Sequence, residues 1–142
     1  MFFQILKEPI DIEALITGAF HPECGAVASF IGTTRADESG GARVEYLEYE
    51  AYRPMADKKL REIGEEIRER WNIGYVAIVH RIGRVDPGEP SVAIVVAAPR
   101  RGPAFEASRY AIERIKEIAP IWKREIWSDG YVWVGSQVST RP

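Results

Sequence analysis

Two lysines in the C-terminal third of the chain have surroundings that suit proton transfer or anion binding. Lys116 and Lys123 flank the short segment EIAPIW. Lys116 falls in the last turn of a predicted helix, where a cation also stabilises the helix dipole. Lys123 lies between Ile121 and Trp127 on one face of the strand predicted next. Two interpretations stay open for Lys123: a partly desolvated amine with a lowered pKa, or an aliphatic stem lying over the tryptophan with its ammonium group in water.

Positive charge is concentrated around these lysines. Residues 100–124 carry a net charge of +4, whereas the rest of the chain carries −6. Arg100 and Arg101 precede a predicted long helix, where free backbone N–H groups and the helix dipole favour an anion. Arg35 ends the motif GTTR after a strand of small residues, where backbone can approach a ligand closely. Each arginine alone is compatible with an ordinary surface position, but together they indicate a site for a small anion such as phosphate or carboxylate.

Other common catalytic and metal-binding motifs are absent from the sequence. There is no Gly-rich phosphate loop, no HExxH and no GxSxG. With Cys24, His21 and His80 as the only cysteine and histidines, the chain has no soft metal site at a usual spacing. We expect Cys24 to be a structural or incidental thiol, because nothing near it in sequence except His21 could activate it. We expect His80 to be a hydrogen-bonded core histidine rather than a base.

The elements that must position these residues follow from local patterns. Two long helices are predicted from apolar residues at spacings of three and four, one from Pro54 to about Trp71 and one that Pro103 opens and Pro120 ends. A short helix is predicted at Ile12–Thr17 with Asp11 as its N-cap. Strands are predicted at Phe2–Leu6, Gly25–Ile31, Val44–Glu50, Tyr75–His80, Ser91–Ala98, Ile121–Trp127 and Tyr131–Val134.

This order of elements predicts an α+β domain with a mostly antiparallel sheet, on which two long helices and one short helix pack. Residues 36–42 (ADESGGA) have loop composition. The 142 residues suit one domain, 1–142, and 46% hydrophobic content is typical of a folded chain.

Composition also excludes some classes of function. A net charge of −2 argues against a generic nucleic-acid binder. The longest apolar run, Val92–Ala98, is too short to span a bilayer. Lys7 and Glu8 come too early for a signal peptide, so we expect a cytoplasmic protein. On the residues alone, a non-catalytic anion-binding module and an RNA-binding α+β domain remain alternatives to an enzyme, the second because Tyr and Trp lie beside Arg and Lys.

Five stretches of the chain form a pattern when read in order: GAVASFIGTTR (Gly25–Arg35), LEYEAYRPMA (Leu47–Ala56), HRIGRVDPGE (His80–Glu89), RRGPAFEA (Arg100–Ala107) and KEIAPIWKRE (Lys116–Glu125). Together they resemble the large, catalytic subunit of molybdopterin synthase. The resemblance implies the α/β-hammerhead-like fold of that subunit. It also implies a sulfurtransferase, which moves sulfur twice from the C-terminal thiocarboxylate of a small ubiquitin-like subunit to cyclic pyranopterin monophosphate. The product is the dithiolene of molybdopterin, made in molybdenum cofactor biosynthesis.

The resemblance also assigns residues and partners. It implies that Lys116 and Lys123 are catalytic, that no metal or cofactor is needed, and that neither nucleic acid nor a membrane is a partner. The substrate-binding residues that it implies are Thr33, Thr34, Arg35, Arg100, Arg101, Arg124 and Glu125. Many family members have histidine where this chain has Arg100, so anion binding rather than proton transfer is expected there.

Helix geometry adds an expectation about assembly. Arg101 and Lys116 are fifteen residues apart on one predicted helix, which separates them by roughly 22 Å at 1.5 Å per residue. One small substrate cannot easily touch both ends from the same chain. We therefore expect a homodimer with composite sites, and a small subunit at each outer end to give a heterotetramer.

Overall fold

Two apolar strands, β5 (Tyr75–Arg81) and β7 (Pro90–Ala98), form the centre of a four-stranded sheet. The computed structural model describes residues 1–134. The strand order is β1-β5-β7-β2, with β1 (Phe2–Leu6) parallel to β5 and β2 (Ala26–Thr33) antiparallel to β7. β1 and β2 are therefore the edge strands of this sheet within the described residues.

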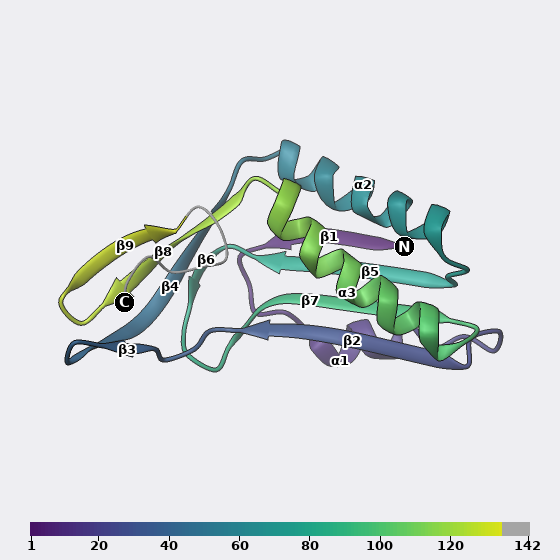
Figure 1. Cartoon of the computed structure of the whole chain (residues 1–142), viewed down its shortest axis with the longest axis horizontal. Helices are drawn as coiled ribbons and strands as arrows, with labels where there is room; N and C mark the ends of the chain where they lie inside the picture. The colour runs from purple at the N-terminus through teal and green to yellow at the C-terminus, as the bar shows by residue number, and fades with distance from the viewer. Residues whose placement is uncertain (135–142) are drawn as a thin grey trace.

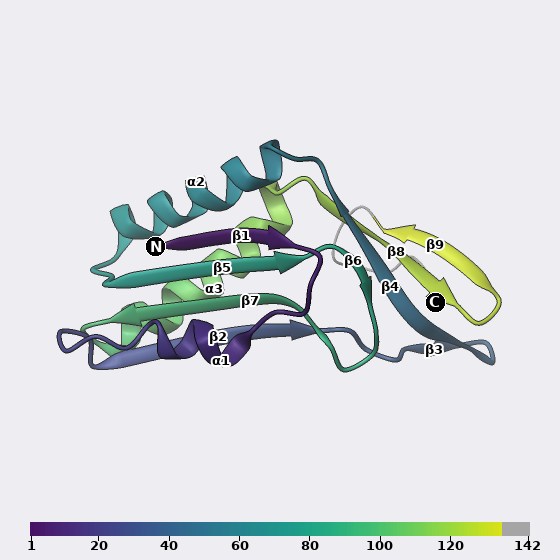
Figure 2. The same ribbon diagram turned by 180° about the vertical axis from the view of Figure 1, so that it is seen from behind.

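Helices cover both faces of this sheet (Figures 1 and 2). α2 (Met55–Arg70) and α3 (Arg101–Ile118) lie on one face, and the short α1 (Ile12–Thr17) lies on the other. Alternation along β5 explains why both faces are covered: Ile78 packs under α2 and α3, while Val79 packs near α1. As predicted, the Asp11 side chain caps α1, accepting a hydrogen bond of 3.1 Å from the backbone N–H of Ala14.

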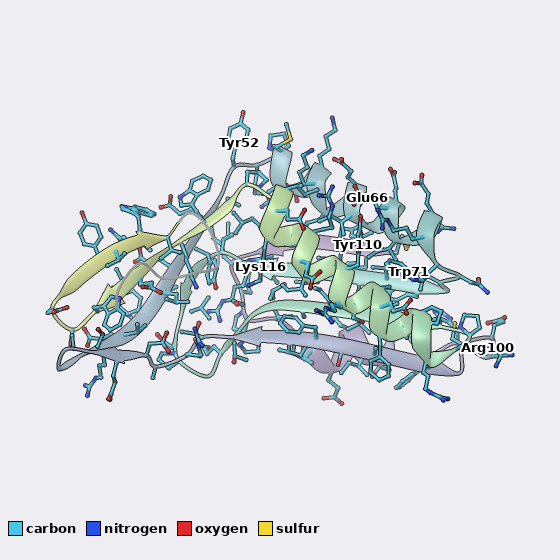
Figure 3. All side chains as sticks on the ribbon, viewed as in Figure 1. Tyr52, Glu66, Trp71, Arg100, Tyr110 and Lys116 are labelled. Atoms are coloured by element: carbon cyan, nitrogen blue, oxygen red, sulfur yellow. The ribbon has the colours of Figure 1, made fainter. Side chains whose placement is uncertain are left out.

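Polar contacts join the two long helices on their outer side (Figure 3). Glu66 of α2 accepts hydrogen bonds of 2.9 and 3.0 Å from Arg114 of α3, and one of 2.6 Å from the hydroxyl of Tyr110. These bonds from Arg114 and Tyr110 hold the pKa of the Glu66 carboxyl at about 2. The Glu66 carboxyl is therefore ionised at neutral pH, and its bonds with Arg114 and Tyr110 hold α3 against α2.

A second sheet extends beyond the end of the first (Figure 1). Its central strand is β4 (Ala42–Ala51), which pairs with β8 (Ile121–Trp127), with the short β3 (Glu38–Ser39) and with β6 (Gly83–Val85). β9 (Gly130–Val134) pairs with β8 as the predicted terminal hairpin. β8 follows α3 after a connection of two residues. The C-terminal end of α3 is therefore held next to the second sheet.

The structure corrects three expectations about the elements. The sheet is not single, because β4 pairs with β8, and β8 with β9, in a second sheet, to which the short β3 and β6 add at β4. Residues 36–42 are not only a loop: they include β3, which turns into β4 through Gly40 and Gly41, both at positive φ. α3 begins at Arg101 rather than at Pro103, since proline is tolerated anywhere in a first helical turn. No helix within residues 1–134 is both long and apolar enough to cross a membrane.

Candidate active site

A cavity of about 360 Å³ lies where the two sheets meet the C-terminal end of α3. Its walls come from the end of β2, from β4, β5, β7 and β8, and from the last turns of α3. Figure 3 shows Lys116 at this end of α3, facing the junction between the sheets. Segments far apart in sequence therefore meet around one hollow.

Three of the predicted site cations line this cavity: Arg35, Lys116 and Lys123. Burial lowers the pKa of the Lys116 amine, and the charges of Lys123 and Arg35 lower it further. Burial also lowers the pKa of the half-buried Lys123, with Arg35 acting in the same direction. Of the two interpretations left open for Lys123, the structure favours the desolvated amine. Three like charges in one hollow form a site that favours an anion.

Glu125 lies behind Lys123 on the same face of β8. The residue is 3% exposed, and its carboxylate accepts a hydrogen bond of 3.2 Å from Trp127 Nε1. Its negative charge opposes the lowering of the Lys123 pKa. It also raises the pKa of Tyr49, after the larger effect of burial. Glu125 is therefore a buried counter-charge for the lysine and does not line the cavity itself.

Arg124, which was predicted to contact substrate, points away from the cavity. Arg124 lies on the opposite face of β8 from Lys123, where it pairs with Glu48 and lies over the rings of Tyr131 and Trp133. Strand alternation explains this position, since neighbouring residues of a strand face opposite sides.

Thr34 is also turned away from the cavity. The residue is 4% exposed, and its Oγ1 has no hydrogen-bond partner within residues 1–134. Its backbone is held by the turn that precedes β7: Thr34 N–H donates to the Glu89 carbonyl, and the Gly88 N–H donates to the Thr34 carbonyl. Thr33, which precedes this contact, does line the cavity.

Arg100 and Arg101 lie at the far end of α3. Both are exposed, and Figure 3 shows Arg100 and Lys116 at opposite ends of the helix. α3 is helical from Arg101 to Ile118, so the predicted separation of roughly 22 Å between Arg101 and Lys116 holds. Within one chain, these arginines do not belong to the cavity.

Sequence reasoning did not assign several polar residues that line the cavity, among them Tyr49, His80 and Ser91. His80 is buried and hydrogen-bonded, as expected for a core histidine. Tyr49 and His80 both fall in stretches that carry the family resemblance, but their convergence depends on the pairing of β4 with β8 and of β5 with β7. No local pattern reports such a non-local contact.

The fold and the cavity define a class of protein: an α+β domain with a cavity lined by two lysines and an arginine, which suits a small anion. The model of the MoaE protein family matches residues 5–118. The molybdopterin synthase catalytic subunit of Halalkalibacterium halodurans is 54% identical over 138 residues, covering 97% of this chain and 88% of that protein. The crystal structure of molybdopterin synthase from Staphylococcus aureus matches with a TM-score of 0.89 at 49% identity, covering 94% of this chain and 96% of that chain.

A more distant chain shares the fold alone. It comes from the complex of subunits 1 and 2 of molybdopterin-converting factor from Helicobacter pylori, with a TM-score of 0.77 at 20% identity, and covers 93% of this chain and 89% of that chain. The chain described here belongs to the MoaE protein family. The family and the α+β fold predicted from the sequence are confirmed, and so is the predicted class of activity, an enzyme of sulfur transfer in molybdenum cofactor biosynthesis.

Proposed function

We propose that the cavity transfers sulfur from the C-terminal thiocarboxylate of a small ubiquitin-like subunit to cyclic pyranopterin monophosphate, twice, to form the dithiolene of molybdopterin. The observation that carries this proposal is the convergence of Arg35, Lys116 and Lys123 in one cavity of a MoaE-family fold. The thiocarboxylate brings sulfur that is already activated, so the proposal requires no nucleophile, metal or cofactor from this chain. The cytoplasmic location expected from the sequence is part of the same proposal.

Lys123 acts on the reacting carbon of the pterin side chain. As sulfur adds to this carbon and oxygen leaves, negative charge develops on the oxygen and a proton must reach it. A half-buried ammonium whose pKa is lowered by burial gives up its proton more readily than an exposed lysine. The buried carboxylate of Glu125 keeps this ammonium charged until it is needed.

Lys116 and Arg35 orient the two anions. Lys116 stands at the end of α3 and holds the thiocarboxylate or the leaving oxygen, while the guanidinium of Arg35 binds phosphate oxygens. Thr33, beside Arg35 on the cavity wall, offers a hydroxyl to the same phosphate. Arg124 belongs to the aromatic surface of β8 and β9 and acts on the substrate only through the strand that it shares with Lys123.

A second copy of the chain completes the site. β2 is an edge strand within the described residues, and Phe30 of β2 and Phe105 of α3 are large apolar side chains exposed to 38% and 67%. β2 and α3 run in the same direction, from Ala26 and Arg101 toward the cavity. A two-fold axis across the middle of this face reverses the second copy. Its Arg100 and Arg101 then reach the lysine end of the first copy, where they bind the phosphate.

The partner that supplies sulfur is the small ubiquitin-like subunit. The Helicobacter pylori structure of the same fold is a complex of subunits 1 and 2 of molybdopterin-converting factor. For this chain we propose one small subunit at each outer end of the dimer, with its C-terminal tail in the cavity.

A reconstituted reaction tests the proposed function. Purified protein, thiocarboxylated small subunit and cyclic pyranopterin monophosphate are mixed, and mass spectrometry follows the dithiolene product and the spent carboxylate tail. We expect product from the unmodified protein and at least about a hundredfold slower single-turnover transfer from Lys123→Ala. A complex that forms without product contradicts the assignment, and so do normal rates in both Lys116→Ala and Lys123→Ala.

A further inference from the structure

His80 is a buried polar side chain on the cavity wall that the reaction described above does not use. It lies on β5 between Ile5 of β1 and Val92 of β7, on the face of the sheet that α2 and α3 cover. The residue is only 6% exposed, yet it lines the cavity. A polar group in this position meets any ligand that fills the hollow.

One hydrogen bond fixes the tautomer of His80. Its Nδ1 lies 2.8 Å from the backbone carbonyl oxygen of Arg81. A carbonyl oxygen only accepts, so Nδ1 carries the proton and Nε2 keeps its lone pair. Within residues 1–134, Nε2 has no hydrogen-bond partner. The ring is further held by Tyr49, whose ring lies edge-on with centroids 5.0 Å apart.

The Tyr49 and Ser91 hydroxyls, which line the same cavity as His80, already donate elsewhere. The Ser91 hydroxyl donates to the Gly32 carbonyl at 3.3 Å, and the Tyr49 hydroxyl donates to Ser91 Oγ at 3.4 Å. The hydroxyl protons of Tyr49 and Ser91 are therefore both committed to one hydrogen-bond chain, which ends at the Gly32 carbonyl. Neither hydroxyl donates to His80, and Nε2 stays available to a ligand.

The cations around the cavity explain why a ligand would need the Nε2 lone pair as an acceptor. Arg35, Lys116 and Lys123 carry only donors, so they bind the anionic parts of a ligand. A ring system with N–H or O–H groups also needs an acceptor, and a donor buried without one costs binding energy. Burial, together with the nearby charge of Lys116, lowers the pKa of His80 to about 4. The ring is therefore neutral at neutral pH, and Nε2 can accept.

We propose that His80 is a substrate-binding residue whose Nε2 accepts a hydrogen bond from a ring N–H or O–H of the substrate, so that the cavity selects a ring-bearing phosphate over a simple anion. This inference rests on the proposed function, because it takes cyclic pyranopterin monophosphate as the ligand. In this inference His80 recognises the ring of the substrate, whereas the cations recognise its anionic groups.

Two variants separate the two ring nitrogens. His80→Asn keeps an N–H near the position of Nδ1, which can still donate to the Arg81 carbonyl, but it removes the acceptor. His80→Gln places a carbonyl oxygen near the position of Nε2 and keeps the acceptor. We expect His80→Asn to bind cyclic pyranopterin monophosphate about tenfold more weakly, and His80→Gln to stay within about threefold of the unmodified protein. Inorganic phosphate, the matched control ligand, should bind all three proteins alike.

A measurement on the unmodified protein covers the case in which a variant does not fold. In protein with ¹⁵N-labelled histidine, the Nε2 resonance of His80 should move when cyclic pyranopterin monophosphate is added and stay in place when inorganic phosphate is added. An unmoved resonance in the presence of bound pterin overturns the inference, as does full affinity in a folded His80→Asn variant. Absence of pterin binding to the unmodified protein instead contradicts the proposed function.

Discussion

Mixing two inactive chains tests whether the two ends of α3 serve different copies of the site. One chain carries Arg101→Ala and the other carries Lys123→Ala, and each homodimer is expected to be inactive or nearly so. Because α3 holds Arg101 and Lys116 roughly 22 Å apart, a small substrate in the proposed dimer would contact the lysines of one chain and the arginines of the other. Mixed dimers should therefore regain activity that neither parent has.

The expected recovery follows from the two-fold arrangement. Random exchange of equal amounts gives about one half mixed dimers. In each mixed dimer one site combines the intact Lys123 of one chain with the intact Arg101 of the other, and the second site carries both defects. One site in two is restored in half of the dimers, so the mixture should reach about one quarter of the unmodified activity.

Single-turnover sulfur transfer measures the recovery, and native mass spectrometry counts the mixed dimers. Lys116→Ala mixed with Lys123→Ala is the matched control. Both of these lysines line the cavity of one chain, so every site in a mixed dimer keeps one defect and no recovery is expected. If the first mixture forms mixed dimers and stays as inactive as its parents, the composite site is refuted.

Three further predictions concern stability and pH. Gly64→Ala in α2 should lower the free energy of unfolding by about 1–2 kcal/mol in urea, because the added Cβ would lie 2.2 Å from Phe3 Cζ. In a Phe3→Ala background the same change should be neutral or stabilising, since alanine is favoured over glycine in a helix by about 0.5–1 kcal/mol. Single-turnover rates should fall on the basic side at a pH below the ordinary lysine pKa of 10.5, because burial lowers the pKa of Lys123. Glu125→Gln should move this fall to still lower pH, since the carboxylate raises the Lys123 pKa; an unmoved profile would assign the titration to another group. The hydrogen bonds that Glu66 accepts from α3 lower its pKa from 4.5 to about 2. The stability that ionised Glu66 adds to the folded protein is therefore complete above pH 4.5 and is lost as pH falls toward 2. In urea unfolding, the stability of Glu66→Gln should therefore depend less steeply on pH in that range than the stability of the unmodified protein. An equally steep dependence would count against a stabilising role for the bonds of Glu66 with α3.

Local signals predicted most of the elements. Asp11 before an apolar run gave the bounds of α1, and Pro120 ended α3, as the structure has them. The alternation in β8 already separated Lys123 and Glu125 on one face from Arg124 on the other. These features depend on residues a few positions apart, which is the range over which caps, prolines and periodicity act.

Long-range pairing could not be predicted in the same way. β6 is three residues long and exists because β4, more than thirty positions earlier, offers it a free edge. The second sheet, and with it the cavity wall from Tyr49 to Lys123, follows from the still more distant pairing of β4 with β8. The residues around His80 were missed for the same reason, because Tyr49 and Ser91 approach it from separate strands. The cations of the site were found because charge, unlike packing, can be counted along the chain.

α3 acts as a spacer of fixed length in the proposed dimer. One inserted residue would move its far end by about 1.5 Å and rotate it by about 100°. Such an insertion would move Arg100 and Arg101 of each copy away from the lysines of the other copy, so both sites would be disrupted together. Between Arg101 and Lys116, substitutions on the solvent face can therefore accumulate, whereas insertions and deletions are expected to be excluded.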